Sequence, residues 1–194
     1  MKPFFIPAAL ALVLTGTAAL AEPVAYDFDP SHSQVVFDYG HMGFSTSTGI
    51  INGVTGKLML DAENPASSSV EATIPLSGLV SVSPVLDGHL FGPNFLNTDK
   101  ATALATFKST KVEVEGDGKE AKVTGDLTLN GVTKPVVLDV ELRQLAKHPM
   151  SGQEVAGFDA ETSILRSDFN LGKFAPAVDD KLDISITVEA PKAG

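Results

Sequence analysis

The sequence predicts an all-β protein built from antiparallel strands, and three observations carry this prediction. Apolar and polar residues alternate with a period of two through most of the chain after residue 22, and helical periodicity is almost absent. Each alternating run has one apolar and one polar face, which is typical of antiparallel sheets. Tight-turn sequences separate several of the runs. About eight such strands fit either a sandwich or a closed barrel, and closure removes exposed sheet edges.

The alternation defines the expected strands in chain order. Their apolar faces contain Val35, Phe37, Tyr39 and His41; Val70, Ala72 and Ile74; Val112 and Val114; Val123, Leu127 and Leu129; Val136, Leu138, Val140 and Leu142; Ala156, Phe158, Ala160, Thr162 and Ile164; and Leu182, Ile184, Ile186 and Val188. Gly116-Asp117-Gly118 and Asn130-Gly131 lie between consecutive runs, so residues 105–145 are predicted to form an antiparallel meander. Asn52-Gly53 predicts a second hairpin.

Residues 76–104 interrupt the alternation. A connection of this length without regular structure is rare in compact domains and often forms a lid or a binding element. The spacing of Leu86 and Leu90 predicts a short helix ahead of Asn94-Phe95-Leu96. We expect this segment to cover one mouth of the barrel.

The first 21 residues have the pattern of a secretory signal. Lys2 precedes an apolar stretch from Phe4 to Leu14, and Ala19-Leu20-Ala21 matches an A-x-A cleavage site. The apolar stretch is shorter than the about 20 residues that span a membrane. We therefore expect cleavage after Ala21, one mature domain over residues 22–194, no stable membrane insertion and a periplasmic location, with secretion as second choice.

Charge and cysteine content exclude several classes of function. The chain has 14 basic and 24 acidic residues, a net charge of −10, which argues against a nucleic-acid partner. It has no cysteine, so disulfides, thiolate metal ligands and cysteine nucleophiles are absent. A homodimer remains open.

Small residues accompany large ones on the predicted apolar face, among them Ala72, Gly125, Ala156, Ala160 and Thr162. Two interpretations remain at this point. The small residues either taper a filled core, or they leave a cavity that holds one apolar ligand. A cavity would suit an elongated lipid, because burial of each CH₂ group contributes about 0.8 kcal/mol.

Two groups of polar residues raise the question of catalysis. Asp29, Ser31, His32 and Ser33 are the residue types of a catalytic triad. However, triad members converge from separated segments, whereas neighbours in an extended chain point to opposite faces. We assign no catalytic residue here.

The second group is His32, His41 and His89, which could ligate a metal together with Asp29 or Asp87. Their spacing matches no established metal motif, so we predict no metal and keep a metal-dependent enzyme as an alternative function. A structural or stress-related interaction protein with a filled barrel is a further alternative.

Arg166 lies beside Asp168 after a predicted strand. It either pairs with Asp168 in a solvated turn or orients the polar head of a ligand by a forked contact at one end of the barrel.

Ordered motifs run through the whole mature chain. They are Asp29-Pro30-Ser31-His32-Ser33, then Phe37, His41, Gly43, Ser45, Gly49 and Gly56; Asp87-Gly88-His89-Leu90 and Phe95; Thr106-Phe107-Lys108-Ser109-Thr110; Gly125-Asp126-Leu127-Thr128-Leu129-Asn130-Gly131-Val132-Thr133-Lys134-Pro135-Val136; and Arg166-Ser167-Asp168-Phe169. Together they cover residues 26–190 and resemble the YceI-like family.

The resemblance implies a lipocalin-like antiparallel β-barrel, periplasmic, that binds a long isoprenoid or other lipid and is not an enzyme. No cofactor is expected besides the lipid. The resemblance places the ligand pocket at Phe37, Tyr39, His41, Phe95, Leu127, Leu138, Phe158 and Phe169, with polar contacts from His32, Arg166 and Asp168. Asn170 stands where the family usually has glycine, and residues 91–94 and 101–104 also depart from its pattern, so we expect differences in the turn and the lid.

Overall fold

The computed structural model describes residues 22–194, so the predicted secretory signal lies outside the described residues. The strands are β1 (Val24–Asp27), β2 (Gln34–His41), β3 (Ser45–Asn52), β4 (Thr55–Leu60), β5 (Ser69–Pro75), β6 (Leu79–Val80), β7 (Leu104–Glu115), β8 (Glu120–Leu129), β9 (Val132–Lys147), β10 (Glu154–Leu165) and β11 (Lys181–Pro191). The helices are α1 (Pro84–Phe91) and the 3₁₀ turns η1 (Pro65–Ser67), η2 (Leu76–Gly78) and η3 (Arg166–Phe169).

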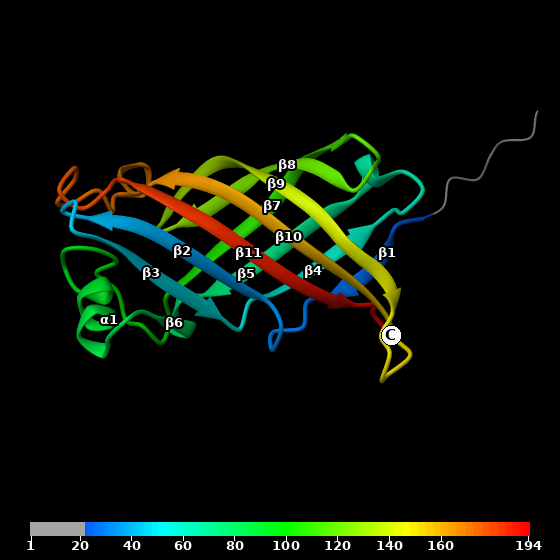
Figure 1. The fold of residues 1–194 in the computed structure, drawn as a ribbon, viewed down its shortest axis with the longest axis horizontal. Helices are drawn as coiled ribbons and strands as arrows, with labels where there is room; N and C mark the ends of the chain where they lie inside the picture. Colours follow the sequence, from blue (N-terminus) through cyan, green and yellow to red (C-terminus); the bar gives the residue numbers. More distant parts are fainter. Residues whose placement is uncertain (1–21) are drawn as a thin grey trace, which may run out of the picture.

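The eleven strands form one antiparallel sheet that curls into a barrel (Figure 1), in the order β1-β4-β5-β7-β8-β9-β10-β11-β2-β3-β6. The β1 edge of the sheet reaches the far part of the sheet, and β6 forms the other edge. An isolated bridge between Tyr26 and Lys192 joins β1 to the chain after β11, and β6 pairs with β3. The all-β barrel prediction is confirmed, with eleven strands in place of about eight. Strands such as β1 and β6 are too short for alternation to mark them.

The predicted meander over 105–145 is confirmed. Strands β7, β8 and β9 are neighbours in the sheet, and Leu129 pairs with Val132 across the two-residue turn Asn130-Gly131. Both turn residues have positive φ angles, 51° and 74°, which asparagine and glycine adopt more readily than other residues.

The hairpin predicted at Asn52-Gly53 is wrong. A turn exists there, but β3 pairs with β2 and β6, whereas β4 pairs with β1 and β5. The turn η2 lies against it, so close that a Cβ atom on Gly78 would lie 2.2 Å from the carbonyl oxygen of Asn52. The chain therefore passes from one edge of the sheet to the other at this turn. The strand β4 cannot pair with β3, because η2 and β6 occupy the free side of β3.

The short helix expected in residues 76–104 is confirmed as α1. Ser83 caps it by accepting a hydrogen bond from the backbone N–H of Leu86 at 3.2 Å, and Pro84 occupies the first turn, where its missing N–H costs nothing. Figure 1 shows α1 at one end of the barrel, which we call the α1 end, while β1 and the C-terminus lie toward the opposite end. No helix in residues 22–194 is long and apolar enough to span a bilayer.

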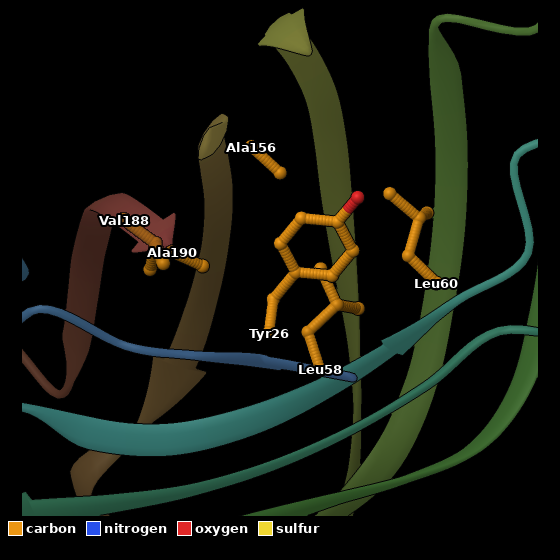
Figure 2. Packing of buried hydrophobic residues seen from close by; sticks show 6 residues of the cluster. All are labelled: Tyr26, Leu58, Leu60, Ala156, Val188 and Ala190. Carbon is orange, nitrogen blue, oxygen red and sulfur yellow. The ribbon is translucent and has the colours of Figure 1, made fainter. Parts of the chain in front are cut away.

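Toward the end opposite α1, a packed cluster around Tyr26 fills part of the barrel interior. Figure 2 shows the Tyr26 ring among Leu58, Leu60, Ala156 and Ala190, and both alanines are completely buried. Alanine at these positions leaves room for the ring, so at this end the tapered-core interpretation is correct. The Tyr26 hydroxyl donates a 2.7 Å hydrogen bond to Glu154, which satisfies the buried phenol.

Candidate ligand-binding cavity

An elongated cavity of about 690 Å³ occupies the rest of the interior. The inward positions of nearly every strand line it, as the alternation predicts; β10 and β11 alone contribute Phe158, Ala160, Thr162, Leu182, Ile184 and Ile186. Its volume lies within the range of about 300–1,000 Å³ that is usual for small-molecule sites. Lining residues at both ends, among them His89 and Lys119, are exposed, so the cavity reaches the surface. The interpretation of a wholly filled barrel is therefore wrong.

Most of the residues predicted to contact a ligand lie on this cavity. They are Phe37, Tyr39, His41, Phe95, Leu127, Leu138, Phe158 and Arg166. Three do not line it: His32, Asp168 and Phe169. Alternation alone could not separate the two groups, because these three lie in turns or in η3, where the two-residue period no longer applies.

Two of the lining phenylalanines take the space that a glycine on a neighbouring strand leaves. A Cβ atom on Gly49 would lie 2.2 Å from the Phe37 ring, and one on Gly125 would lie 2.3 Å from the Phe107 ring. Each ring therefore lies against the sheet rather than across the barrel. Gly125 contributes to ring placement, whereas Ala72, Ala160 and Thr162 line open space.

The α1 segment covers one mouth of the cavity, as the sequence predicted. Leu86, Leu90, Phe95 and Leu96 of this segment all line the cavity. The Phe95 ring packs at 5.9 Å, with a 52° tilt, against Phe174 from the loop after η3. The mouth is thus formed by two segments that are far apart in sequence.

Arg166 holds the second of these segments in place. Its side chain is buried, at 6% exposure, and its Nε donates to the carbonyl of Asp179 at 2.7 Å. The two terminal nitrogens donate to the carbonyls of Leu171 and Val178 at 2.6 and 2.7 Å, with a longer contact of 3.4 Å to Lys173. Burial lowers the pKa of this guanidinium, although the nearby Asp180 opposes the shift.

The pairing of Arg166 with Asp168 that the sequence left open is wrong. Asp168 points away and lies 3.7 Å from Lys134. Phe169 is 1% exposed and packs in a cluster with Val136 and Leu171 behind the cavity wall. Backbone carbonyls accept hydrogen bonds from four of the five N–H groups of Arg166. Its role in this geometry is therefore to hold the loop after η3 in place.

The sequence analysis expected a different turn after η3, because Asn170 stands where the family usually has glycine. Asn170 has φ 59° and ψ 26°, the left-handed conformation that glycine also favours. Its backbone therefore gives no reason for a different turn at this position.

His32 lies outside the cavity and is paired with Asp29. The two side chains are 2.7 Å apart, Nδ1 to Oδ2, and the His32 side chain is 61% exposed. The hydrogen bond to Asp29 raises the pKa of His32, and the same bond, with the Ser31 amide, lowers the pKa of Asp29. Ser33 instead faces the carbonyl of Glu189, so these residues do not form a triad.

The three histidines of the metal alternative do not meet. His41 and His89 line the cavity, whereas His32 does not. Within residues 22–194 no group of three or more histidine, aspartate or glutamate side chains is arranged to hold a metal ion. The metal-dependent alternative thus has no site in the described chain.

Apart from Thr162, whose hydroxyl donates to the carbonyl of Val137, the few polar side chains on the cavity lie near its two ends. At the α1 end these are Tyr39, His41 and His89, together with Arg166, and at the opposite end Ser68, Ser69 and Lys119. The sequence analysis missed Lys119, which lies in the turn between β7 and β8 and carries no pattern that marks it as inward-facing. No buried side-chain nitrogen or oxygen in the described residues lacks a hydrogen-bond partner.

Comparison with known proteins places this architecture in a family. The YceI-like domain family matches residues 26–190, and protein YceI of Escherichia coli O157:H7 is 37% identical over 178 residues, 92% of this chain and 91% of the relative. The chain belongs to the YceI-like family. The crystal structure of the YceI protein of Campylobacter jejuni is similar with a TM-score of 0.69 and 28% identity, over 80% of this chain and 90% of that one.

A further YceI-like fold is the polyisoprenoid binding domain from Saccharophagus degradans. It matches with a TM-score of 0.62 and 15% identity, over 88% of this chain and 99% of that domain. At this identity the likeness concerns the fold alone.

Proposed function

We propose that this YceI-like protein binds a long-chain lipid, an isoprenoid foremost, in the barrel interior and that it acts as a carrier in the periplasm. The observation that carries the proposal is the apolar cavity of about 690 Å³ lined by aliphatic and aromatic side chains. Water leaving these walls and a hydrocarbon tail supplies affinity with few polar contacts, at about 0.8 kcal/mol per CH₂ group. The polyisoprenoid binding named for the Saccharophagus degradans domain and the signal-like pattern of residues 1–21 support the ligand class and the location.

The proposal is for binding rather than catalysis. The candidate triad and the candidate three-histidine site do not form, for the reasons given above. Apart from Thr162, whose hydroxyl is used by the carbonyl of Val137, the polar side chains on the cavity lie near its ends, and its walls are apolar, which suits holding a hydrocarbon chain.

The first experiment is mass spectrometry of an organic extract of the protein purified from the periplasm, followed by uptake of prenyl lipids by the delipidated protein. A bound isoprenoid or other long-chain lipid at near-stoichiometric amount is the expected result. Absence of any lipid in the extract, together with no uptake, contradicts the proposal.

The second experiment narrows the cavity. Ala160→Phe places a ring in the open space, and each ligand carbon that it displaces removes about 0.8 kcal/mol. Displacement of three or four carbons weakens binding by about 50- to 200-fold. Glu161→Phe is the matched control, because Glu161 is exposed and the next residue of a strand points to the opposite face.

Ala72→Leu narrows the cavity from a different strand, β5. This second variant keeps the test decisive if Ala160→Phe fails to fold. Circular dichroism checks that all three variants keep the β-barrel. Equal lipid uptake by folded Ala160→Phe, Ala72→Leu and wild-type protein would mean that the ligand does not occupy the cavity.

A further inference from the structure

We propose that the α1 end of the cavity binds the head group of the lipid and that this head group is uncharged and hydrogen-bonding, such as a hydroxyl. The binding groups are the Tyr39 hydroxyl and the imidazoles of His41 and His89. This inference rests on the proposed lipid binding and adds the orientation of the ligand and the charge class of its head.

The three side chains reach the cavity from two elements. Tyr39 and His41 are two residues apart on β2, so they share its inward face, and His89 comes from α1 above the mouth. The chain's other two histidines form hydrogen bonds within their own turns. His32 binds Asp29, and His148 accepts hydrogen bonds from nearby backbone amides.

None of the three polar groups is engaged within the protein. Among residues 22–194 the side chains of Tyr39, His41 and His89 form no hydrogen bond with another residue, although all three line the cavity. A phenol both donates and accepts, and a neutral imidazole has one donor and one acceptor nitrogen. His41 and His89 are exposed, so water can bind their imidazoles. A hydroxyl head can replace that water with its own hydrogen bonds, whereas a bare hydrocarbon cannot.

Cations near this mouth are already engaged. Arg166 donates to backbone carbonyls. Lys100 donates to the carbonyl of Leu79, and Lys173 binds Asn94.

Carboxylates also lie at this end. Asp179 and Asp180 are close enough to Arg166 to act on its charge, and Asp179 accepts a hydrogen bond from Gly40. An anionic phosphate head would therefore lose hydration, find the donors of these cations already directed at protein oxygens, and face like charges.

The opposite end has different chemistry. Lys119 is the one lysine that lines the cavity in the described residues, and Ser68 and Ser69 also lie at that end of the lining. A phosphate head would favour that end, because a lysine ammonium is a strong point charge for phosphate. The two head-group classes thus predict opposite orientations, which variants at each end can distinguish.

The test compares the binding of a prenyl alcohol, its monophosphate and a terpene hydrocarbon of the same length, all measured in the same buffer. The delipidated protein is used as wild type and as the variants Tyr39→Phe, His41→Leu/His89→Leu and Lys119→Met. His32→Leu is the matched control, since that imidazole lies outside the cavity.

We expect the alcohol to bind more tightly than the monophosphate and the hydrocarbon. Tyr39→Phe, which keeps the ring and removes one hydrogen-bonding group, should weaken the alcohol by about 2- to 10-fold, and the double histidine variant by more. Binding of the hydrocarbon should not change in any of these variants, nor should Lys119→Met or His32→Leu affect the alcohol.

Two results overturn the inference while leaving lipid binding intact. One is tighter binding of the monophosphate that depends on Lys119, which places the head at the opposite end. The other is alcohol binding that neither Tyr39→Phe nor the histidine variant weakens. If wild-type protein binds none of the three probes, the proposed function itself fails.

Discussion

Replacement of Arg166 by lysine tests whether one side chain holds the mouth of the cavity. Arg166 donates three short hydrogen bonds, of 2.6 to 2.7 Å, to the carbonyls of Leu171, Val178 and Asp179. Leu171 and Val178 line the cavity themselves. A lysine keeps the charge but places its donors on a single atom, so it cannot reach three carbonyls that surround a planar fork.

The expected cost follows from these contacts. A hydrogen bond to a charged group contributes about 1.5–3 kcal/mol, and the variant loses about two of the three short ones. We therefore expect the free energy of unfolding to fall by about 3–6 kcal/mol, close to the loss seen for other disrupted buried charge networks. For a domain of this size the corresponding fall in Tm is about 6–24 °C.

Arg143→Lys provides the control, because the chain contains only these two arginines. Arg143 is 60% exposed and lies 3.4 Å from Asp159 and 3.8 Å from Glu141. Exposed ion pairs contribute about 0–1 kcal/mol, so this variant should change stability by less than about 0.5 kcal/mol.

Urea unfolding followed by circular dichroism measures both variants, with the slope of the transition used to check that the unfolded states are comparable. Arg166→Lys should also weaken lipid uptake, because the loop that carries Phe174 loses its anchor. The reasoning is refuted if the two lysine variants unfold at the same urea concentration.

Three further predictions follow from single contacts. Asp29→Asn should lower the pKa of His32 toward the ordinary 6.5, as measured by NMR titration. Because the pKa is raised in the folded state, the stability that this pair contributes is fully present below pH 6.5 and is lost as the pH rises through the folded-state pKa. Burial, with the hydrogen bond to a glutamate, raises the pKa of Tyr26 to about 12 from 10.0, so the unfolded state loses its proton first, and stability should fall from about pH 10 upward more steeply in wild type than in Tyr26→Phe. Gly125→Val should destabilise the protein by about 1–3 kcal/mol in urea unfolding, because the added carbons overlap the Phe107 ring; an unchanged midpoint would contradict this packing.

Regular strands are the part of this protein that the sequence specifies most directly. Along β10, Phe158, Ala160, Thr162 and Ile164 all line the cavity, as their spacing requires. The same local logic predicted the Asn130-Gly131 turn and α1, since positive φ angles and helix caps depend on residues close in sequence.

The position of the sheet edges, and which part of the barrel interior side chains fill, depended on contacts between distant segments. Nothing near Asn52-Gly53 shows that η2 will separate β3 from β4. Ala156 and Ala160 have the same residue type and inward position, yet Ala156 packs against the cluster around Tyr26 and Ala160 faces open space.

The sequence by itself determined which face of each strand turns inward, because side-chain direction in a strand has a period of two that neighbouring residues set. It also contained the family motifs and thus the barrel. Only the tertiary structure decided that the interior is hollow along most of its length but filled around Tyr26, and that Arg166 binds loop carbonyls instead of Asp168. These outcomes depend on the volume and position of groups brought together from distant parts of the chain, which no local pattern encodes.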